Sequence, residues 1–384
     1  MPAVPAPLLD FHHPASDRAV GALLGAPAAA ALVGTSPTLT AHTTGPGTAH
    51  ARLVRAGLTD LAGPDQPPRP PENPVERAWA AALRTAARTG ALPSCAPALE
   101  RTTADDPLGA SWRALTRTLR PAEDPARGSF ACTHLVDSVW SAYAAAGDRA
   151  ALYTGTLATA LWGASALPLH ALRRLSETTD PHTLTTTALT TARGPHPTLW
   201  PEHPVLVAEP RRLPPFAVPH PLDPGVLLGN LDHLRAHPDT VDAAVSLCRT
   251  HPSDAPHLPP ADWVRVWLHD RRGANSHPHF TLDEAAAAVA ALRAEGKRVL
   301  LHCWAGASRT PAVATRYAVT ALGAPVLPTL AAMIRTVGGH LDNPSLSRAV
   351  ARLSGVDLPD PAATLFPEGV PPRRPELPEP HVTG

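Results

Sequence analysis

The chain has 384 residues, 44% of them hydrophobic, which is enough for two or three domains and excludes a wholly disordered protein. Its 33 basic and 33 acidic residues cancel, which excludes a global positive field of the kind that recruits nucleic acid or an anionic membrane. Proline makes up 48 residues, well above the average share of about 5%, and predicts many loops.

The first half is predicted to be helical, over residues 1–63 and 75–175, with the proline-dense stretch Pro64–Pro74 as a loop between. Within it, Trp79–Arg88 is alanine-rich, and Leu135–Ala146 and Leu152–Gly163 carry apolar residues at three- and four-residue spacing, as packed helices do. A second proline-dense zone, Pro195–Pro221, marks the expected domain boundary. We therefore expect an all-α domain over residues 1–194 and a linker over residues 195–212.

The second half changes to short β-branched and aromatic runs that alternate with helices. Strands are predicted at Val241–Leu247, Trp263–Leu268 and Val299–His302. A helix over Thr281–Glu295, with Thr281 as its N-cap in a capping box, and another from Thr310 to about Leu322 complete the pattern. This alternation predicts an α/β domain over residues 213–358, with a mainly parallel central sheet flanked by helices. Residues 359–384 are expected to be a proline-rich disordered tail.

The four cysteines lie far apart and form no CxxC pair, which favours a reducing cytoplasm over a disulfide scaffold or a zinc site. The apolar stretch Ala19–Gly34 has the composition of a signal-peptide core. Asp10 and Asp17 stand where such a peptide needs positive charge, and Pro27 interrupts the run, so we expect a cytoplasmic protein.

The stretch from Val299 to Thr310 carries the chemistry, because a cysteine, five residues and an arginine stand between a predicted strand and a predicted helix. A loop of this length can turn its N–H groups inward and form an anion-binding nest with the helix N-terminus. Such a nest would lower the pKa of Cys303, and the planar guanidinium of Arg309 can hold two phosphoryl oxygens at once. The pattern predicts a thiolate that attacks phosphate esters.

This loop resembles that of the protein tyrosine phosphatase superfamily, and specifically the dual-specificity pattern HCxxGxxR followed by Ser or Thr. The matching residues are His302, Cys303, Gly306, Arg309 and Thr310. The resemblance covers about residues 213–353 and implies that the phosphate is bound by Trp304, Ala305, Gly306, Ala307, Ser308 and Arg309. It also implies that Thr310 donates a hydrogen bond to the Cys303 sulfur, that His302 orients the loop, and that no cofactor is needed. The alternative is a buried structural cysteine at the end of a strand.

The same family uses an aspartate as general acid, and Asp270 lies 33 residues before Cys303, after a predicted strand. It would protonate the leaving oxygen and then deprotonate the hydrolytic water. The alternative is a solvated loop aspartate. Asp283 is a weaker candidate because it falls within the predicted capping box, and Asp262 lies at the opposite end of the strand.

The first half shows a second resemblance. Arg18–Gly25 looks like the opening helix of ADP-ribosylglycohydrolases, and Gly155–Gly163, running on to Pro168, is similar to their late glycine-rich helix. That all-α fold holds two magnesium ions with aspartates.

The chain departs from this pattern at the metal-binding positions. Alanines at Ala28–Ala31 replace one Gly-Asp pair, the run Gly45–Thr48 replaces Thr-Asp-Asp-Thr, and Ala146 replaces a later aspartate, which leaves Asp148 alone. One carboxylate cannot hold two magnesium ions, so we expect an ADP-ribosylglycohydrolase-like domain without its metal site. An unrelated alanine-rich helical domain is the alternative.

Together these features predict a cysteine-dependent protein phosphatase that hydrolyses phosphotyrosine, with phosphoserine and phosphothreonine as further candidates. The substrate would be a phosphorylated protein or a small phosphomonoester, and neither nucleic acid nor a membrane is expected as a partner. Two alternatives stay open. One is a pseudophosphatase that binds phosphate without turnover, and the other is an ADP-ribosyl hydrolase or ADP-ribose-binding protein acting through the first half. The sequence does not determine the oligomeric state.

Overall fold

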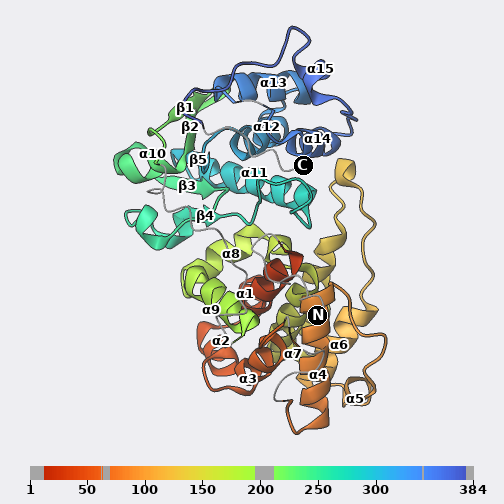
Figure 1. The fold of residues 1–384 in the computed structure, drawn as a ribbon. Coiled ribbons are helices and arrows are strands. Elements are labelled where there is room, and N and C mark those ends of the chain that lie inside the picture. Colours follow the sequence, from red (N-terminus) through yellow and green to blue (C-terminus); the bar gives the residue numbers. More distant parts are fainter. Residues whose placement is uncertain (1–12, 62, 64–69, 195–211, 340, 378–384) are drawn as a thin grey trace, which may run out of the picture. The chain divides into compact units, whose positions relative to one another are not determined.

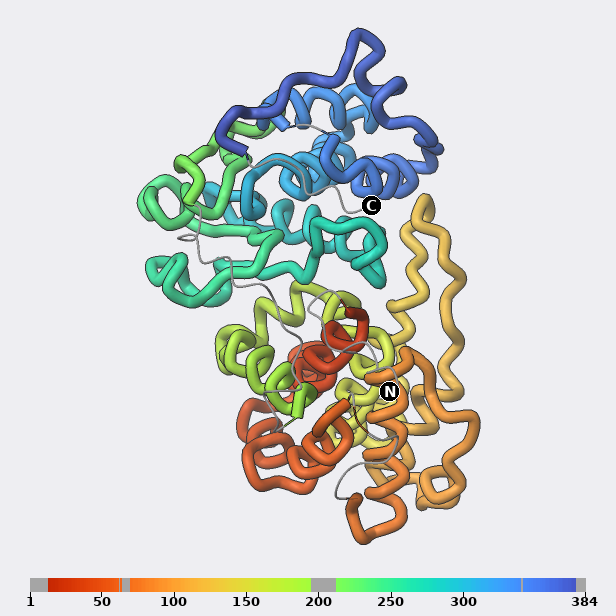
Figure 2. The backbone as a smooth tube through the Cα atoms, viewed as in Figure 1, coloured from red at the N-terminus to blue at the C-terminus, as the bar shows by residue number. Residues whose placement is uncertain are grey.

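The computed structural model describes residues 13–61, 63, 70–194, 212–339 and 341–377. These residues form two compact units, whose chain path can be followed in Figures 1 and 2. The first unit comprises Met1–Ala122 and Ala131–Pro204, and the second comprises Glu123–Phe130 and Val205–Gly384. The segment Glu123–Phe130 thus belongs to the second unit, although it lies inside the range predicted for the first domain. Most of the predicted linker 195–212 and of the loop Pro64–Pro74 lies outside the described residues.

The first unit is helical throughout its described residues. Its α-helices are α1 (Pro14–Val33), α2 (Pro37–Thr44), α3 (Ala49–Leu58), α4 (Pro74–Thr89), α5 (Pro97–Glu100), α6 (Pro107–Arg117), α7 (His134–Trp162), α8 (Leu169–Ser176) and α9 (Pro181–Arg193). Two helices predicted within residues 135–163 are joined in α7, with a kink where Ala146 and Gly147 leave helical geometry, Gly147 at φ 74°. Helix α9 lies beyond the predicted helical range.

Helices α1 and α7 cross closely because glycines face each other at the crossing. A Cβ atom on Gly25 would lie 2.3 Å from the carbonyl oxygen of Gly155, and one on Gly21 would lie 2.5 Å from that of Thr159. Any larger residue at these positions would push the two helices apart. Helix packing therefore accounts for the glycines on which the second resemblance rests.

The second unit is built on a mixed five-stranded sheet flanked by helices (Figure 1). Its strands are β1 (Ala217–His220), β2 (Asp223–Asn230), β3 (Ala243–Ser246), β4 (Trp263–Arg265) and β5 (Val299–Cys303). Its α-helices are α10 (Leu231–Ala236), α11 (Pro278–Ala294), α12 (Arg309–Leu322), α13 (Val326–Thr336), α14 (Pro344–Arg352) and α15 (Pro361–Leu365). The strand order is β1-β2-β5-β3-β4, and only the edge pair β1–β2 is antiparallel.

Strand β5 lies at the centre of this sheet and is buried along its whole length. A continuous apolar run is what a central parallel strand covered on both faces requires. Ligand sites of such sheets form beyond the carboxyl ends of the strands, and β5 ends at Cys303.

One sequence prediction at the C-terminal end of this unit is wrong. The tail is ordered over residues 360–377, where Leu365 and Phe366 join a buried cluster with Leu330 and Ile334 of α13. Although the tail is rich in proline, it also contains a few spaced apolar side chains, and these pack against an apolar surface. At the other end of the unit, strand β1 lies inside the proline-dense zone 195–221 and within the predicted α/β domain, as a short edge strand where Pro219 is tolerated.

The capping box predicted at Thr281 is also wrong. Helix α11 begins three residues earlier, at Pro278, because proline fits the first helical turn. The Thr281 hydroxyl donates to the carbonyl of His277 from inside the helix, at 2.9 Å. Among the described residues, no helix combines the length and apolar character needed to cross a bilayer.

Candidate active site

The loop between β5 and α12 has the geometry of an anion-binding nest. Cys303 is buried at the end of β5, and the N–H of Gly306 donates to its sulfur at 3.2 Å. Gly306 has φ 72°, and a Cβ atom there would lie 2.6 Å from the carbonyl oxygen of Gly229. Both the backbone conformation and the close approach require glycine, so Gly306 allows the loop to curl around the sulfur.

The surroundings of Cys303 favour the thiolate. Burial acts to raise the pKa of the thiol, but the Arg309 charge and the hydroxyl and backbone N–H of Thr310 hold that pKa below its ordinary value. Cys248, by contrast, has its pKa raised to about 12 by burial. Because the thiolate is the nucleophilic form, these surroundings favour Cys303 over Cys248 as a nucleophile.

Arg309 is fixed by two backbone carbonyls in the segments that follow strands β3 and β4. Its Nη1 donates to the carbonyl of Leu247, just after β3, at 2.6 Å, and to that of Leu268 at 3.2 Å. Burial acts to lower the pKa of Arg309, but the charges of Cys303 and Asp270 outweigh it and raise the pKa. The guanidinium is therefore a permanent, oriented cation beside the sulfur.

Asp270 lies at this loop. Its Oδ1 accepts hydrogen bonds from the Ser308 hydroxyl at 2.8 Å and from the Asn343 amide at 3.1 Å. Its Oδ2 lies 3.5 Å from Nε of Arg309. The two weaker candidates for the acid lie elsewhere, since Asp283 pairs with Arg316 and Asp262 with Lys297.

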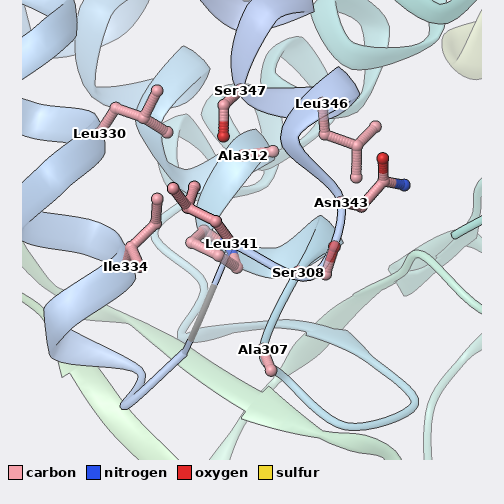
Figure 3. Close-up of a pocket in the computed structure, with 10 residues that line it drawn as sticks. Ala307, Ser308, Ala312, Leu330, Ile334, Leu341, Asn343, Leu346 and Ser347 are labelled. Carbon is pink, nitrogen blue, oxygen red and sulfur yellow. The ribbon is translucent and has the colours of Figure 1, made fainter. Parts of the chain in front are cut away.

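A pocket adjoins the loop on the side of α13 and α14 (Figure 3). Its lining is mainly apolar, and Ser308 and Asn343, the two residues that hold Asp270, form part of it. The full lining is Ala307, Ser308, Pro311, Ala312, Leu330, Ile334, Leu341, Asn343, Leu346 and Ser347. None of the described residues that line this pocket is charged.

His302 lies beneath the loop in a buried chain of hydrogen bonds. Nε1 of Trp263 donates to the Ser246 hydroxyl at 2.8 Å, and that hydroxyl lies 2.6 Å from Nε2 of His302. The Cys303 carbonyl can only accept, so Nδ1 of the neutral ring donates to it at 3.3 Å and Nε2 accepts from Ser246. Burial lowers the pKa of His302 to about 4, so the ring is neutral.

The rest of the predicted loop differs in exposure. Trp304 is 37% exposed, whereas Ala307 is buried against Leu213 and Leu377. Ala305 is half-buried, and its carbonyl accepts a hydrogen bond from Arg374. The structure therefore brings Cys303, Gly306, Ser308, Arg309, Thr310 and Asp270 together at one site, with His302 below them.

Sequence reasoning missed three residues of this site, Ser246, Asn343 and Arg374. Each meets its partner across at least 56 residues of chain, and none belongs to a local motif. Ser246 could have been suspected as a site residue, because it is a polar residue at the end of a buried strand. No such feature of the sequence marks Asn343 or Arg374.

In the first unit, the remaining carboxylate of the second resemblance, Asp148, accepts a hydrogen bond from the Thr35 hydroxyl at 2.6 Å. Over the described part of the chain, no group of three or more His, Cys, Asp or Glu side chains is placed to hold a metal ion.

No protein-family model matches the chain, and no curated protein does. Among solved structures, a crystal structure of human DUSP28 aligns with 37% of this chain and 94% of its own, at 23% sequence identity and a TM-score of 0.30.

Proposed function

We propose that the second unit hydrolyses phosphate monoesters, foremost phosphotyrosine, through a cysteinyl-phosphate intermediate, with phosphoserine and phosphothreonine as further substrates. The observation that carries the proposal is the convergence of Cys303, Arg309 and Asp270 on one loop whose Gly306 N–H points at the sulfur. A nucleophile, a phosphate clamp and a proton donor are the groups that this two-step reaction needs.

In the first step, the Cys303 thiolate attacks phosphorus and the bond to the leaving oxygen breaks. Arg309 and the inward N–H groups bind the equatorial oxygens, where negative charge accumulates. The carboxyl group of Asp270 gives its proton to the leaving oxygen, which departs as a phenol or alcohol.

In the second step, the Asp270 carboxylate takes a proton from water as the water attacks phosphorus. The sulfur–phosphorus bond breaks, inorganic phosphate forms, and Cys303 leaves as a thiolate. The Gly306 N–H and Thr310 stabilise this thiolate, which makes it a good leaving group.

The side chains of residues 304–308 favour a substrate with a single phosphate group on an aromatic leaving group. Residues 304–308 carry no basic side chain, which disfavours polyanionic substrates such as inositol phospholipids. The exposed Trp304 indole gives a ring against which a phosphotyrosine side chain can pack.

Hydrolysis of p-nitrophenyl phosphate in EDTA tests this proposal, with the full-length protein and its Cys303→Ser and Asp270→Ala variants. We expect Cys303→Ser to abolish turnover and Asp270→Ala to reduce it by about 10²–10⁴-fold, the usual size of a general-acid contribution. Cys95→Ser, at an exposed cysteine in the first unit, is the matched control and should leave turnover unchanged.

Two outcomes would replace the proposal. A wild-type protein that binds vanadate but does not turn over would be a phosphate-binding module. Release of ADP-ribose that requires magnesium and survives Cys303→Ser would move the activity to the first unit.

A further inference from the structure

The peptide group between Ala305 and Gly306 is held at both of its ends. Its N–H, on Gly306, donates to the Cys303 sulfur at 3.2 Å. Its carbonyl oxygen, on Ala305, accepts a hydrogen bond from Nη2 of Arg374, which lies in the segment that follows α15. Sixty-nine residues separate the carbonyl from the arginine that binds it.

We infer that Arg374 is a positioning residue of the active site, which fixes this peptide plane so that its N–H faces the sulfur and the incoming phosphate. The inference rests on the proposed function for its role in catalysis. The contact itself and its effect on anion binding can be measured without turnover.

The loop needs such a restraint because of Gly306. Glycine visits positive and negative φ with similar ease, so the preceding peptide plane can rotate at little cost. A peptide group is planar, and its C=O and N–H point in opposite directions. A flipped plane would therefore turn the Ala305 carbonyl toward the thiolate, where lone pairs and negative charge repel.

The Arg374 guanidinium also makes the Gly306 N–H a stronger hydrogen-bond donor. A charge-assisted hydrogen bond to the carbonyl polarises the peptide group, and hydrogen bonds in a chain reinforce one another. The positive charge of Arg374 thus acts on Cys303 through the Ala305–Gly306 peptide as well as through space.

Arg374 has further contacts around its guanidinium, although its buried Nε and Nη1 have no hydrogen-bond partner among the described residues. Its guanidinium carbon lies 3.7 Å from the centre of the Phe216 ring, and its Nε lies 3.4 Å from the Glu376 carboxylate. The next apolar residue, Leu377, packs on Leu213 and on Ala307 of the loop itself. Burial lowers the pKa of Arg374, and the charges of Glu376 and Cys303 oppose this change.

The test compares Arg374→Met and Arg374→Lys with Arg335→Met in the full-length protein carrying Cys95→Ser. Arg335 stacks over Phe366 of the same C-terminal segment, at 5.0 Å from its ring, and does not touch the loop, so its variant controls for loosening of the tail. Two readouts are used: the pH midpoint of Cys303 alkylation by iodoacetamide, and the affinity for inorganic phosphate measured by calorimetry.

We expect Arg374→Met to raise the alkylation midpoint and to weaken phosphate binding about tenfold, the size of one charge-assisted hydrogen bond. Arg374→Lys should recover part of both losses, and Arg335→Met should change neither. Unchanged midpoint and phosphate affinity in a folded Arg374→Met protein would overturn the inference, as would equal losses in Arg335→Met.

The proposed phosphatase activity and the proposed role of Arg374 can be disproved separately. A wild-type protein that does not hydrolyse p-nitrophenyl phosphate removes the proposed function, while the alkylation midpoint and phosphate affinity still decide the role of Arg374 in the loop. If Arg374→Met does not fold, Arg374→Lys decides instead, because it keeps the charge and loses the planar fork. A lysine variant that matches wild type in both readouts contradicts positioning by the guanidinium.

Discussion

The Ser308 hydroxyl donates a 2.8 Å hydrogen bond to Oδ1 of Asp270 and so joins the last residue of the phosphate loop to the candidate general acid. The same oxygen accepts from Asn343, just before α14. The carboxyl group is therefore held by the loop that we propose binds the phosphate and by a residue just before α14.

Asn343→Ala should impair proton donation more than phosphate binding, because it removes one of two hydrogen bonds that position Asp270. We expect kcat/KM to fall about tenfold for phosphotyrosine, the equivalent of one such hydrogen bond, and to fall less for p-nitrophenyl phosphate, whose leaving group needs less protonation. Steady-state kinetics with both substrates measures the difference. Ser347→Ala, in the same pocket but without a bond to Asp270, is the control, and equal losses for both substrates would contradict the assignment.

Arg309→Lys should lower kcat/KM for p-nitrophenyl phosphate by about 10²–10³-fold, the cost of removing one transition-state donor. Lysine keeps the charge but loses the planar fork, and it cannot bind the carbonyls of Leu247 and Leu268 in the same geometry. Arg348→Lys, at an arginine whose side chain donates to the carbonyl of Pro359, is the matched control. A fully active Arg309→Lys enzyme would exclude the fork as the phosphate clamp.

Alkylation should separate Cys303 from the half-buried Cys248 by pH. The lowered pKa of Cys303 means that its thiolate fraction, and with it the rate, reaches a plateau at lower pH than for a free thiol. Cys248, with its pKa raised to about 12, should stay unmodified up to pH 9. Mass spectrometry after iodoacetamide treatment, with Cys95→Ser to remove the exposed thiol, identifies the site. Modification of Cys248 before Cys303 would contradict this order.

Acid should destabilise the fold through His302. Its folded pKa of about 4 lies below the ordinary value of 6.5, so the unfolded chain binds a proton more readily. The stability that this ring contributes is present above about pH 6.5 and is lost as the pH falls toward 4, by up to about 3 kcal/mol. Urea unfolding at several pH values measures this loss. In His302→Asn the decline should be shallower, and an identical pH dependence in the two proteins would contradict a buried neutral ring.

Phe366→Ala should destabilise the protein by about 3–5 kcal/mol, the usual cost of removing a buried phenylalanine. Phe366 is 3% exposed and packs with Leu330 and Ile334, so the substitution leaves a cavity. Chemical denaturation followed by a probe in the second unit measures the change. Glu368→Ala, at an exposed residue two positions away, is the control, and a loss below 1 kcal/mol in Phe366→Ala would indicate a loosely attached tail.

The parts of the fold that local sequence determines could be predicted. Strand β5, the following loop and α12 have a buried apolar run, a glycine with positive φ and a proline in the first helical turn, each of which acts within a few residues. The predicted strand ends at β3 and β4 run one to three residues too far, because apolar residues continue past the last ladder pair.

The parts of the fold and the site that depend on contacts between distant residues could not be predicted from the sequence. Nothing near Arg374 indicates that it will meet Ala305, and composition alone made its segment look disordered. Asn343 reaches Asp270 across 73 residues. Thr281 has the residue pattern of an N-cap, yet Pro278 starts the helix earlier, so two local rules compete and the sequence does not show which one prevails.

The short segment Glu123–Phe130 determines which parts of the coding sequence are needed for a complete second unit. It lies far from the phosphate loop in sequence, yet the Phe130 ring packs edge-on against Phe280 of α11, with ring centres 5.6 Å apart, and Glu123 lies 3.8 Å from His279. A gene fragment starting at residue 205 would encode the nucleophile and the acid but leave Phe280 without this aromatic partner. Recombination that moved the second unit intact would therefore have to carry two separate stretches of coding sequence.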